Sequence, residues 1–258
     1  MGKVYLVGAG PGDPELLTVR AARILAAADL VLHDALVTRE ILDLVSPQAR
    51  VIDVGKRCGQ KLLTQEEINS YLVHASAHAG VVVRLKCGDP LIFGRAGEEI
   101  EALKNAGIDF EIVPGVTSAL AAAAAARVSL TDRRLASQVL FTTAHRKGGS
   151  MNLDWASAIR ADVTVVVYMP GSAYAELASA LVDHGLDAHT PCVIVSAAAQ
   201  PSQQMHWTDL AGLRSLRGMP APALLIVGRV ARSQVEPIAA DFWKQLPDPT
   251  GAEEQPIA

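Results

Sequence analysis

The sequence is poor in cysteine and in aromatic residues, and its charges nearly balance. Three cysteines occur among 258 residues, and aromatic residues make up 4%. Cys58, Cys87 and Cys192 are far apart and form no C-x-x-C pair, which excludes a disulfide framework and a thiolate zinc site. A net charge of −4 gives no general surface for nucleic acid or membrane, and few aromatic side chains are present for stacking on bases.

Long apolar runs are also missing. No run reaches the ~18–20 residues that span a bilayer. The N-terminus carries one lysine before a short apolar stretch that breaks at Gly8, which is typical of a first strand and not of a signal peptide. Position 6 lacks the Ser or Thr of a myristoylation signal. We therefore expect a protein located in the cytoplasm.

Short apolar runs alternate with helical patterns along most of the chain, which predicts an α/β fold with sheets covered on both faces. Expected strands are 3–8, 30–33, 50–54, 81–86, 109–113, 137–143, 163–169, 191–197, 203–208 and 222–228. Expected helices are 18–28, 38–45, 65–79, 95–106, 117–127, 172–184 and 208–216. A polar break at 128–136 predicts two α/β domains, 1–129 and 130–240. The tail 241–258 is expected to be disordered.

The stretch VGAGPGDPELLT (7–18) follows the first strand and resembles a dinucleotide loop. However, Asp13 replaces the third glycine, and Pro11 and Pro14 remove backbone donors that would cradle phosphate. Asp13 can instead cap the next turn, with Pro14 in the first helical position. A nicotinamide cofactor is disfavoured but stays open, because Asp29 and Asp34 lie near the expected position of a ribose-binding acid.

Two further dense stretches lie at strand ends, namely 84–99 (RLKCGDPLIFGRAGEE) and 114–119 (PGVTSA). Ligands of open α/β sheets bind beyond the carboxyl ends of the strands. We therefore expect the three loops to form one pocket.

Seven motifs in order identify a resemblance to the tetrapyrrole methylase superfamily over residues 3–230. They are VGAGPGDPELLT, LVLHDALV, VGKRCG, RLKCGDPLIFGRAGEE, PGVTSALAAAA, LTDRR and VVYM. The resemblance implies an interdomain cleft between the two α/β domains that binds S-adenosyl-L-methionine, with S-adenosyl-L-homocysteine as product. The implied cofactor contacts are Pro11, Cys87, Gly88, Asp89, Ile92, Thr117, Ser118, Met169, Ala198 and Ala223.

The resemblance also implies methyl transfer to carbon, at C2 and C7 of uroporphyrinogen III, giving precorrin-2 for sirohaem or cobalamin. Asp34 matches the family's proton acceptor and Lys56 its proton donor. A homodimer is implied, without nucleic acid, membrane or metal. The substrate's eight carboxylates need cationic partners. Candidates on loops are Lys56, Arg57, Arg95, Arg133, Arg134, His145, Arg146 and Lys147.

The chain departs from the family pattern at several site positions. Cys87 replaces a glycine, Leu91 a phenylalanine and Ala96 a glycine, while Thr143–His145, Tyr168–Pro170 and Ser196–Ala199 also differ. These departures leave open a methyltransferase for a later precorrin, or a homologue that binds cofactor or tetrapyrrole without catalysis. A related ribosomal RNA methyltransferase is disfavoured by the first loop. His74 and His78 have a spacing that can bind metal, but no third ligand is evident.

Overall fold

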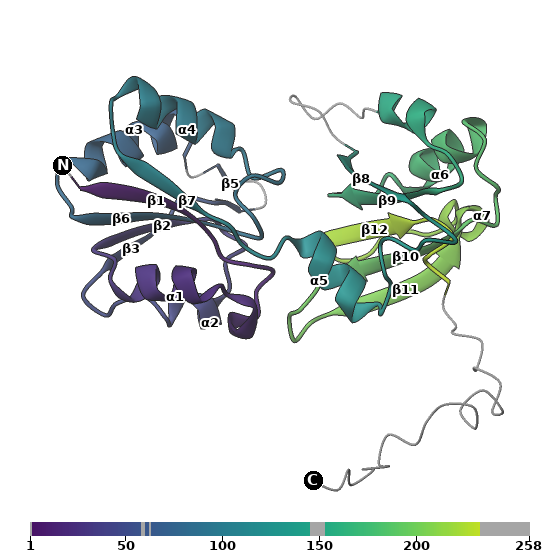
Figure 1. Ribbon diagram of the computed structural model, residues 1–258, viewed down its shortest axis with the longest axis horizontal. Coiled ribbons are helices and arrows are strands. Elements are labelled where there is room, and N and C mark those ends of the chain that lie inside the picture. Colours follow the sequence, from purple (N-terminus) through teal and green to yellow (C-terminus); the bar gives the residue numbers. More distant parts are fainter. Residues whose placement is uncertain (1, 58–59, 62, 145–152, 233–258) are drawn as a thin grey trace, which may run out of the picture.

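The computed structural model describes residues 2–57, 60–61, 63–144 and 153–232, which form two five-stranded sheets side by side (Figure 1) and a short hairpin. The expected α/β class is confirmed. The tail predicted to be disordered, 241–258, lies outside the described residues.

The first sheet is parallel throughout, in the order β3-β2-β6-β1-β7. Its strands are β1 (Lys3–Gly8), β2 (Leu30–His33), β3 (Arg50–Asp53), β6 (Val81–Lys86) and β7 (Phe110–Val113). These strands coincide with the predicted apolar runs, and β1, β2 and β6 carry buried apolar side chains on both faces.

Helices cover both faces of this sheet, as predicted (Figure 1). On one face, α1 (Val19–Ala26) and α2 (Arg39–Leu42) pack against β1, β2 and β6. On the other face, α3 (Gln65–Ser76) and α4 (Ala96–Asn105) pack against the same strands.

Side-chain caps explain where α1 and α3 begin. The Thr18 side chain accepts from the amide of Ala21 at the start of α1, and Thr64 forms a capping box at the start of α3. The turn η1 (Pro14–Leu16) is capped by Asp13, with Pro14 in its first position. The predicted role of Asp13 as a cap is therefore confirmed.

The strand order reverses its direction of winding between β1 and β6. β1 continues into α1 on one face, whereas its neighbour β6 continues into α4 on the opposite face. Loops that diverge from adjacent parallel strands leave room for a ligand at their carboxyl ends. The fold therefore directs two of the three predicted loops to the same place.

The second sheet is mixed, in the order β11-β10-β12-β9-β8. β8 pairs with β9 in parallel, and the other three pairs are antiparallel. Its strands are β8 (Gln138–Thr143), β9 (Val163–Tyr168), β10 (Pro191–Ser196), β11 (Gln204–Asp209) and β12 (Ala223–Val227). One face of this sheet packs against the helices α6 (Tyr174–Asp183) and α7 (Leu210–Leu213) and the turn η2 (Asp154–Ala158).

The alanine-rich helix α5 (Ser118–Ala125) covers the other face of the second sheet (Figure 1). Ala119 and Ala122 are completely buried against strands that include β9 and β12, because a methyl side chain lets helix and sheet approach closely. By packing, α5 thus belongs with the second sheet, although the expected division at 129/130 groups it with the first domain.

Small differences from the predicted elements concern short segments. A hairpin of β4 (Lys56–Arg57) and β5 (Gln60–Lys61) was not predicted. The helices α2 and α7 are shorter than the periodic pattern indicated, because turns complete the pattern at their ends.

Candidate active site

The three predicted loops meet at the carboxyl end of the first sheet. Gly10, after β1, and Gly88, after β6, exchange two backbone hydrogen bonds of 3.1 and 2.7 Å. The amide of Gly115, after β7, donates to Oδ2 of Asp89 at 3.0 Å. The loops are therefore joined directly to one another.

This junction requires glycine. A Cβ on Gly115 would lie 2.3 Å from the carbonyl oxygen of Gly88, and a Cβ on Gly8 would lie 2.6 Å from the amide nitrogen of Gly115. Gly10 and Gly88 both have φ of +68°, which L side chains rarely adopt. Backbone therefore packs on backbone here.

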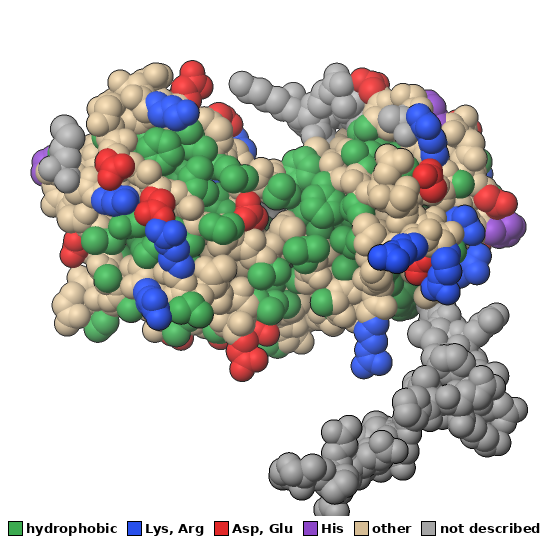
Figure 2. Space-filling view, viewed as in Figure 1, with side chains coloured by type: hydrophobic (Ala, Val, Ile, Leu, Met, Phe, Trp, Pro, Cys, Tyr) green, Lys and Arg blue, Asp and Glu red, His purple; other side chains and the backbone are tan. Residues whose placement is uncertain are grey.

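The second sheet supplies the facing wall. The Thr117 hydroxyl and the Tyr168 hydroxyl, at the end of β9, lie 2.7 Å apart, and Phe93 packs on the Tyr168 ring with centroids 4.7 Å apart. Gln200, after β10, donates from Nε2 to the carbonyl of Pro11 at 3.0 Å. Hydrophobic side chains gather where the two sheets adjoin (Figure 2).

The loops on both sides hold non-glycine residues in the left-handed region. Phe93 has φ of 53° and Met169 has φ of 51°, while Ala197 and Ala199 have 47° and 59°. Such conformations are uncommon outside glycine and concentrate at functional sites. Their positions after β6, β9 and β10 mark the junction of the sheets as the candidate site.

The predicted cofactor residues fall on these same loops and on one adjoining strand. Pro11, Gly88, Thr117 and Ala198 are buried, and Met169 is 53% exposed. The half-buried members are Cys87, Asp89, Ile92, Ser118 and Ala223. Ala223, at the start of β12, pairs with Ser196, so it lies beside the loop that carries Ala198. Their contact with a cofactor stays a prediction.

Asp89 has a structural role that the sequence did not indicate. Its Oδ1 accepts from the amide of Leu91 at 2.8 Å, and its Oδ2 accepts from Gly115. The carboxylate thus ties the loop after β6 to the loop after β7. A carboxylate oxygen can accept two hydrogen bonds, so each oxygen of Asp89 can accept a further one from a ligand.

Cys87 is held as a neutral thiol. Burial, together with the nearby charge of Asp34, raises its pKa to about 11. Its Sγ lies 3.9 Å from the carbonyl oxygen of Gly10. Because the thiolate is the reactive form, Cys87 is a poor nucleophile beside a methyl donor.

Asp34 follows β2 and does not cap a helix with its side chain. Its carboxylate accepts from Nη2 of Arg84, a buried residue of β6. Its predicted partner Lys56 lies in β4, but the side chain of Lys56 falls outside the part of the chain that the structure describes. The roles of Asp34 and Lys56 in proton transfer stay predictions.

Sequence reasoning missed a buried group of charges beside Asp34. Arg84 and Lys86 lie on the same face of β6, and both bind Glu99 of α4. All three side chains are at most 2% exposed. The sequence did carry a signal for this group, because two cations at i and i+2 in an apolar strand must lie on the same face of that strand.

The cations proposed for substrate carboxylates have varied surroundings. Arg95 pairs with Glu98 at 2.7 and 2.8 Å, and Arg134 pairs with Asp132 at 3.0 Å. Arg133 is exposed. The remaining candidates fall outside the described side chains: Lys56, Arg57, His145, Arg146 and Lys147.

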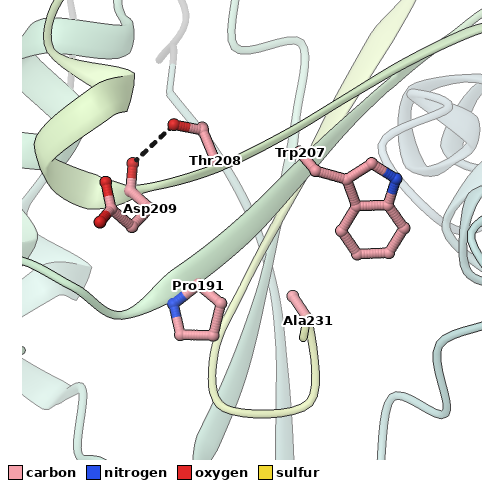
Figure 3. A pocket seen from close by; sticks show the side chains of 5 residues that line it. All are labelled: Pro191, Trp207, Thr208, Asp209 and Ala231. Atoms are coloured by element: carbon pink, nitrogen blue, oxygen red, sulfur yellow. Dashed lines mark hydrogen bonds between the residues drawn. The ribbon is translucent and has the colours of Figure 1, made fainter. Parts of the chain in front are cut away.

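Surface hollows elsewhere do not coincide with the strand-end loops. One of about 370 Å³ lies at the edge of the second sheet, between Pro191, Trp207 and Ala231 (Figure 3). Another, of about 610 Å³, lies over α3 beside Thr64 and His74. Neither is lined by a residue of the joined loops.

Within the described ranges, no set of three or more His, Cys, Asp or Glu side chains is grouped to hold a metal ion. His74 and His78 stack on each other with ring centroids 4.4 Å apart. None of the helices described has the length and apolarity needed to cross a membrane.

Comparison with known proteins gives the family of this chain. The family of Tetrapyrrole (Corrin/Porphyrin) Methylases matches residues 3–213. The chain belongs to this family. The resemblance carried by the ordered motifs is therefore confirmed.

Individual relatives within the family are similar over most of the chain. Uroporphyrinogen-III C-methyltransferase of Paracoccus denitrificans (strain Pd 1222) is 46% identical over 235 residues, which cover 90% of this chain and 82% of that protein. The crystal structure of uroporphyrin-III C-methyl transferase from Thermus thermophilus, complexed with S-adenyl homocysteine, has a TM-score of 0.78. It is 38% identical and covers 90% of this chain and 94% of its own.

A third relative is longer. Siroheme synthase of Chromobacterium violaceum is 49% identical over 232 residues, which make up 89% of this chain and 49% of that protein. The chain thus spans about half the length of that synthase.

Proposed function

We propose that the protein is an S-adenosyl-L-methionine-dependent C-methyltransferase that methylates uroporphyrinogen III at C2 and C7 to give precorrin-2. The junction of glycine-rich loops between two sheets supports this proposal, together with the names of relatives at 46% and 38% identity. The similarity to siroheme synthases favours sirohaem as the end product. We also propose a cytoplasmic homodimer.

The residues of the site fit S-adenosyl-L-methionine. The missing side chains at Gly8, Gly88 and Gly115 let the three loops pack backbone on backbone, which brings the predicted contact residues of these loops together. No lysine or arginine occurs in the loop segments 9–13, 87–93 and 114–118, which suits a cofactor without phosphate. The expected contacts are those of Pro11, 87–89, Ile92, 117–118, Met169, Ala198 and Ala223.

When bound, the cofactor supplies an electrophilic methyl group, whose transfer to a pyrrole carbon leaves the C–S electron pair on sulfur as S-adenosyl-L-homocysteine. The protein's contribution is to hold the two reactants in line, and orientation of this kind contributes up to ~7–11 kcal/mol. The thiol of Cys87 stays protonated and does not compete for the methyl group.

Proton transfer is assigned to two residues outside the cofactor loops. The methylated ring carries a proton that must leave, and the carboxylate of Asp34 accepts it. Lys56 donates a proton elsewhere on the tetrapyrrole. Asp34 suits this role because its carboxylate is 31% exposed at the end of β2 while being bound from inside by Arg84.

The test is incubation of the purified protein, under anaerobic conditions, with S-adenosyl-L-methionine and enzymatically generated uroporphyrinogen III. Release of S-adenosyl-L-homocysteine that depends on uroporphyrinogen III is expected. Parallel reactions with later precorrins distinguish the alternative substrate. Release with a later precorrin and none with uroporphyrinogen III would contradict the proposal.

A further inference from the structure

Beneath the candidate site, strand β6 carries two cations into the interior of the first domain. Arg84 and Lys86 are each 2% exposed, and Glu99 of α4 is completely buried between them. Buried charges are costly unless they are paired and hydrogen-bonded. With Asp34 the group holds two cations and two carboxylates, so its formal charges balance.

Arg84 is fixed on several sides. Its Nε donates to Oε1 of Glu99 at 2.8 Å, and its Nη1 donates to the carbonyls of Leu32 and Leu85 at 3.3 and 3.2 Å. Its Nη2 donates to Oδ1 of Asp34. A planar guanidinium bound in this way has one orientation.

Asp34 is the member of the group that reaches the surface. Its carboxylate is 31% exposed, whereas the other three side chains are at most 2% exposed. The backbone carbonyl of Asp34 also lies 3.0 Å from Nδ1 of His33. One side of the carboxylate thus meets a rigid buried cation, and the carboxylate remains partly exposed.

We propose that Arg84 is a positioning residue for methyl transfer, which fixes the carboxylate of Asp34 in the orientation that receives the substrate proton. This inference rests on the proposed function, in which Asp34 is the proton acceptor. Glu99 and the two carbonyls hold the guanidinium, and the guanidinium holds Asp34. Lys86 balances the second charge of the group through Glu99.

Lysine cannot replace Arg84 in this role. An ammonium is a point donor on a flexible stem, and it cannot bind Glu99, Asp34 and two carbonyls together. Arg84→Lys keeps the buried positive charge but releases Asp34. A change in the position of a catalytic group of about 1 Å lowers the rate by about 10²-fold.

The test measures kcat and KM for methylation of uroporphyrinogen III by Arg84→Lys, with the dissociation constant of S-adenosyl-L-homocysteine measured separately. We expect kcat to fall by about 10²-fold, with KM and the dissociation constant within about twofold of the unaltered protein. In an Asp34→Asn background, Arg84→Lys is expected to change kcat by less than about twofold, because Arg84 then has no proton acceptor to position.

Arg39→Lys is the matched control. Arg39 also binds an aspartate, Asp43, at 2.8 Å, but its side chain is 84% exposed on α2. This variant is expected to keep kcat.

Two results would overturn the inference: an unchanged kcat in Arg84→Lys, or an equal loss in both backgrounds. If Arg84→Lys does not fold, Asp34→Glu decides, because it keeps a carboxylate and displaces it by one methylene. A fall in kcat then supports the inference, and an unchanged kcat overturns it. No methyl transfer by the unaltered protein would instead refute the proposed function, and this inference with it.

Discussion

Gly115→Ala tests the junction of the three loops. The new Cβ would lie 2.3 Å from the carbonyl oxygen of Gly88, whereas Cβ atoms essentially never approach closer than 3.0 Å. The Gly88 carbonyl or its neighbours must therefore shift by at least 0.7 Å, the difference between these distances. Gly115 itself has no left-handed φ, so the effect comes from contact alone.

The expected magnitude follows from two contributions. Overpacking against fixed atoms costs ~1–3 kcal/mol. Displacing Gly88 also weakens its two hydrogen bonds to Gly10, each contributing ~0.5–1.5 kcal/mol. We expect the free energy of unfolding to fall by ~2–4 kcal/mol in urea titrations, and the dissociation constant of S-adenosyl-L-homocysteine to rise at least ~10-fold by calorimetry.

Gly97→Ala is the matched control for this substitution. Gly97 lies in α4, and a Cβ there would meet no atom within 4 Å. Alanine is the better helix former, so this variant is expected to gain ~0.5–1 kcal/mol of stability and to keep its affinity. If Gly115→Ala is as stable as the unaltered protein and binds equally well, the proposed packing of the loops is wrong.

Three further predictions concern single side chains. Iodoacetamide at pH 8 is expected to alkylate Cys87 about a hundredfold more slowly than a small thiol, because a pKa of about 11 leaves little thiolate. Peptide mass mapping measures the rate of alkylation. Gln200→Ala removes a hydrogen bond between the sheets and is expected to weaken S-adenosyl-L-homocysteine binding by about two- to tenfold in calorimetry, whereas the exposed Gln204→Ala leaves it unchanged. His189 is expected to titrate above 6.5 by NMR, since its ring binds Asp209, and its pKa should fall in Asp209→Asn.

Each of these predictions has a contrary result. Rapid alkylation would show that the Cys87 thiol is accessible as thiolate. Equal affinity of the two glutamine variants would show that the Gln200 contact does not support binding. The raised pKa of His189 stabilises the folded protein below about pH 6.5, and this stabilisation is lost as pH rises through the folded-state pKa. A His189 contribution to stability that increases with pH over this range would contradict the ion pair with Asp209.

The sequence was sufficient to predict the main elements and the meeting of three loops at one edge of the first sheet. Apolar runs indicated strands because buried parallel strands carry apolar residues on both faces, and the strand-end loops followed from the rule for open sheets. Gly10 and Gly88 then meet in the structure through backbone hydrogen bonds. The family motifs added the identities of Asp34 and Lys56.

Strand direction, the sheet that a helix covers and the partners of buried charges were not predictable in the same way. Periodicity does not give strand direction, so the antiparallel pairs of β10 were not foreseen. The helix α5 has alanine on every side, so its pattern does not show which sheet it covers. Arg84 and Glu99 are 15 positions apart and pair only because α4 returns across β6.

The most direct test of the proposed function is to count the methyl groups that the protein transfers to uroporphyrinogen III. The product is analysed by mass spectrometry after incubation with isotopically labelled S-adenosyl-L-methionine, with Asp34→Asn treated in parallel. We predict two labelled methyl groups per tetrapyrrole for the unaltered protein and a strongly reduced yield for Asp34→Asn. An unlabelled tetrapyrrole from the unaltered protein, under conditions in which a known uroporphyrinogen III methyltransferase is active, would contradict the proposal.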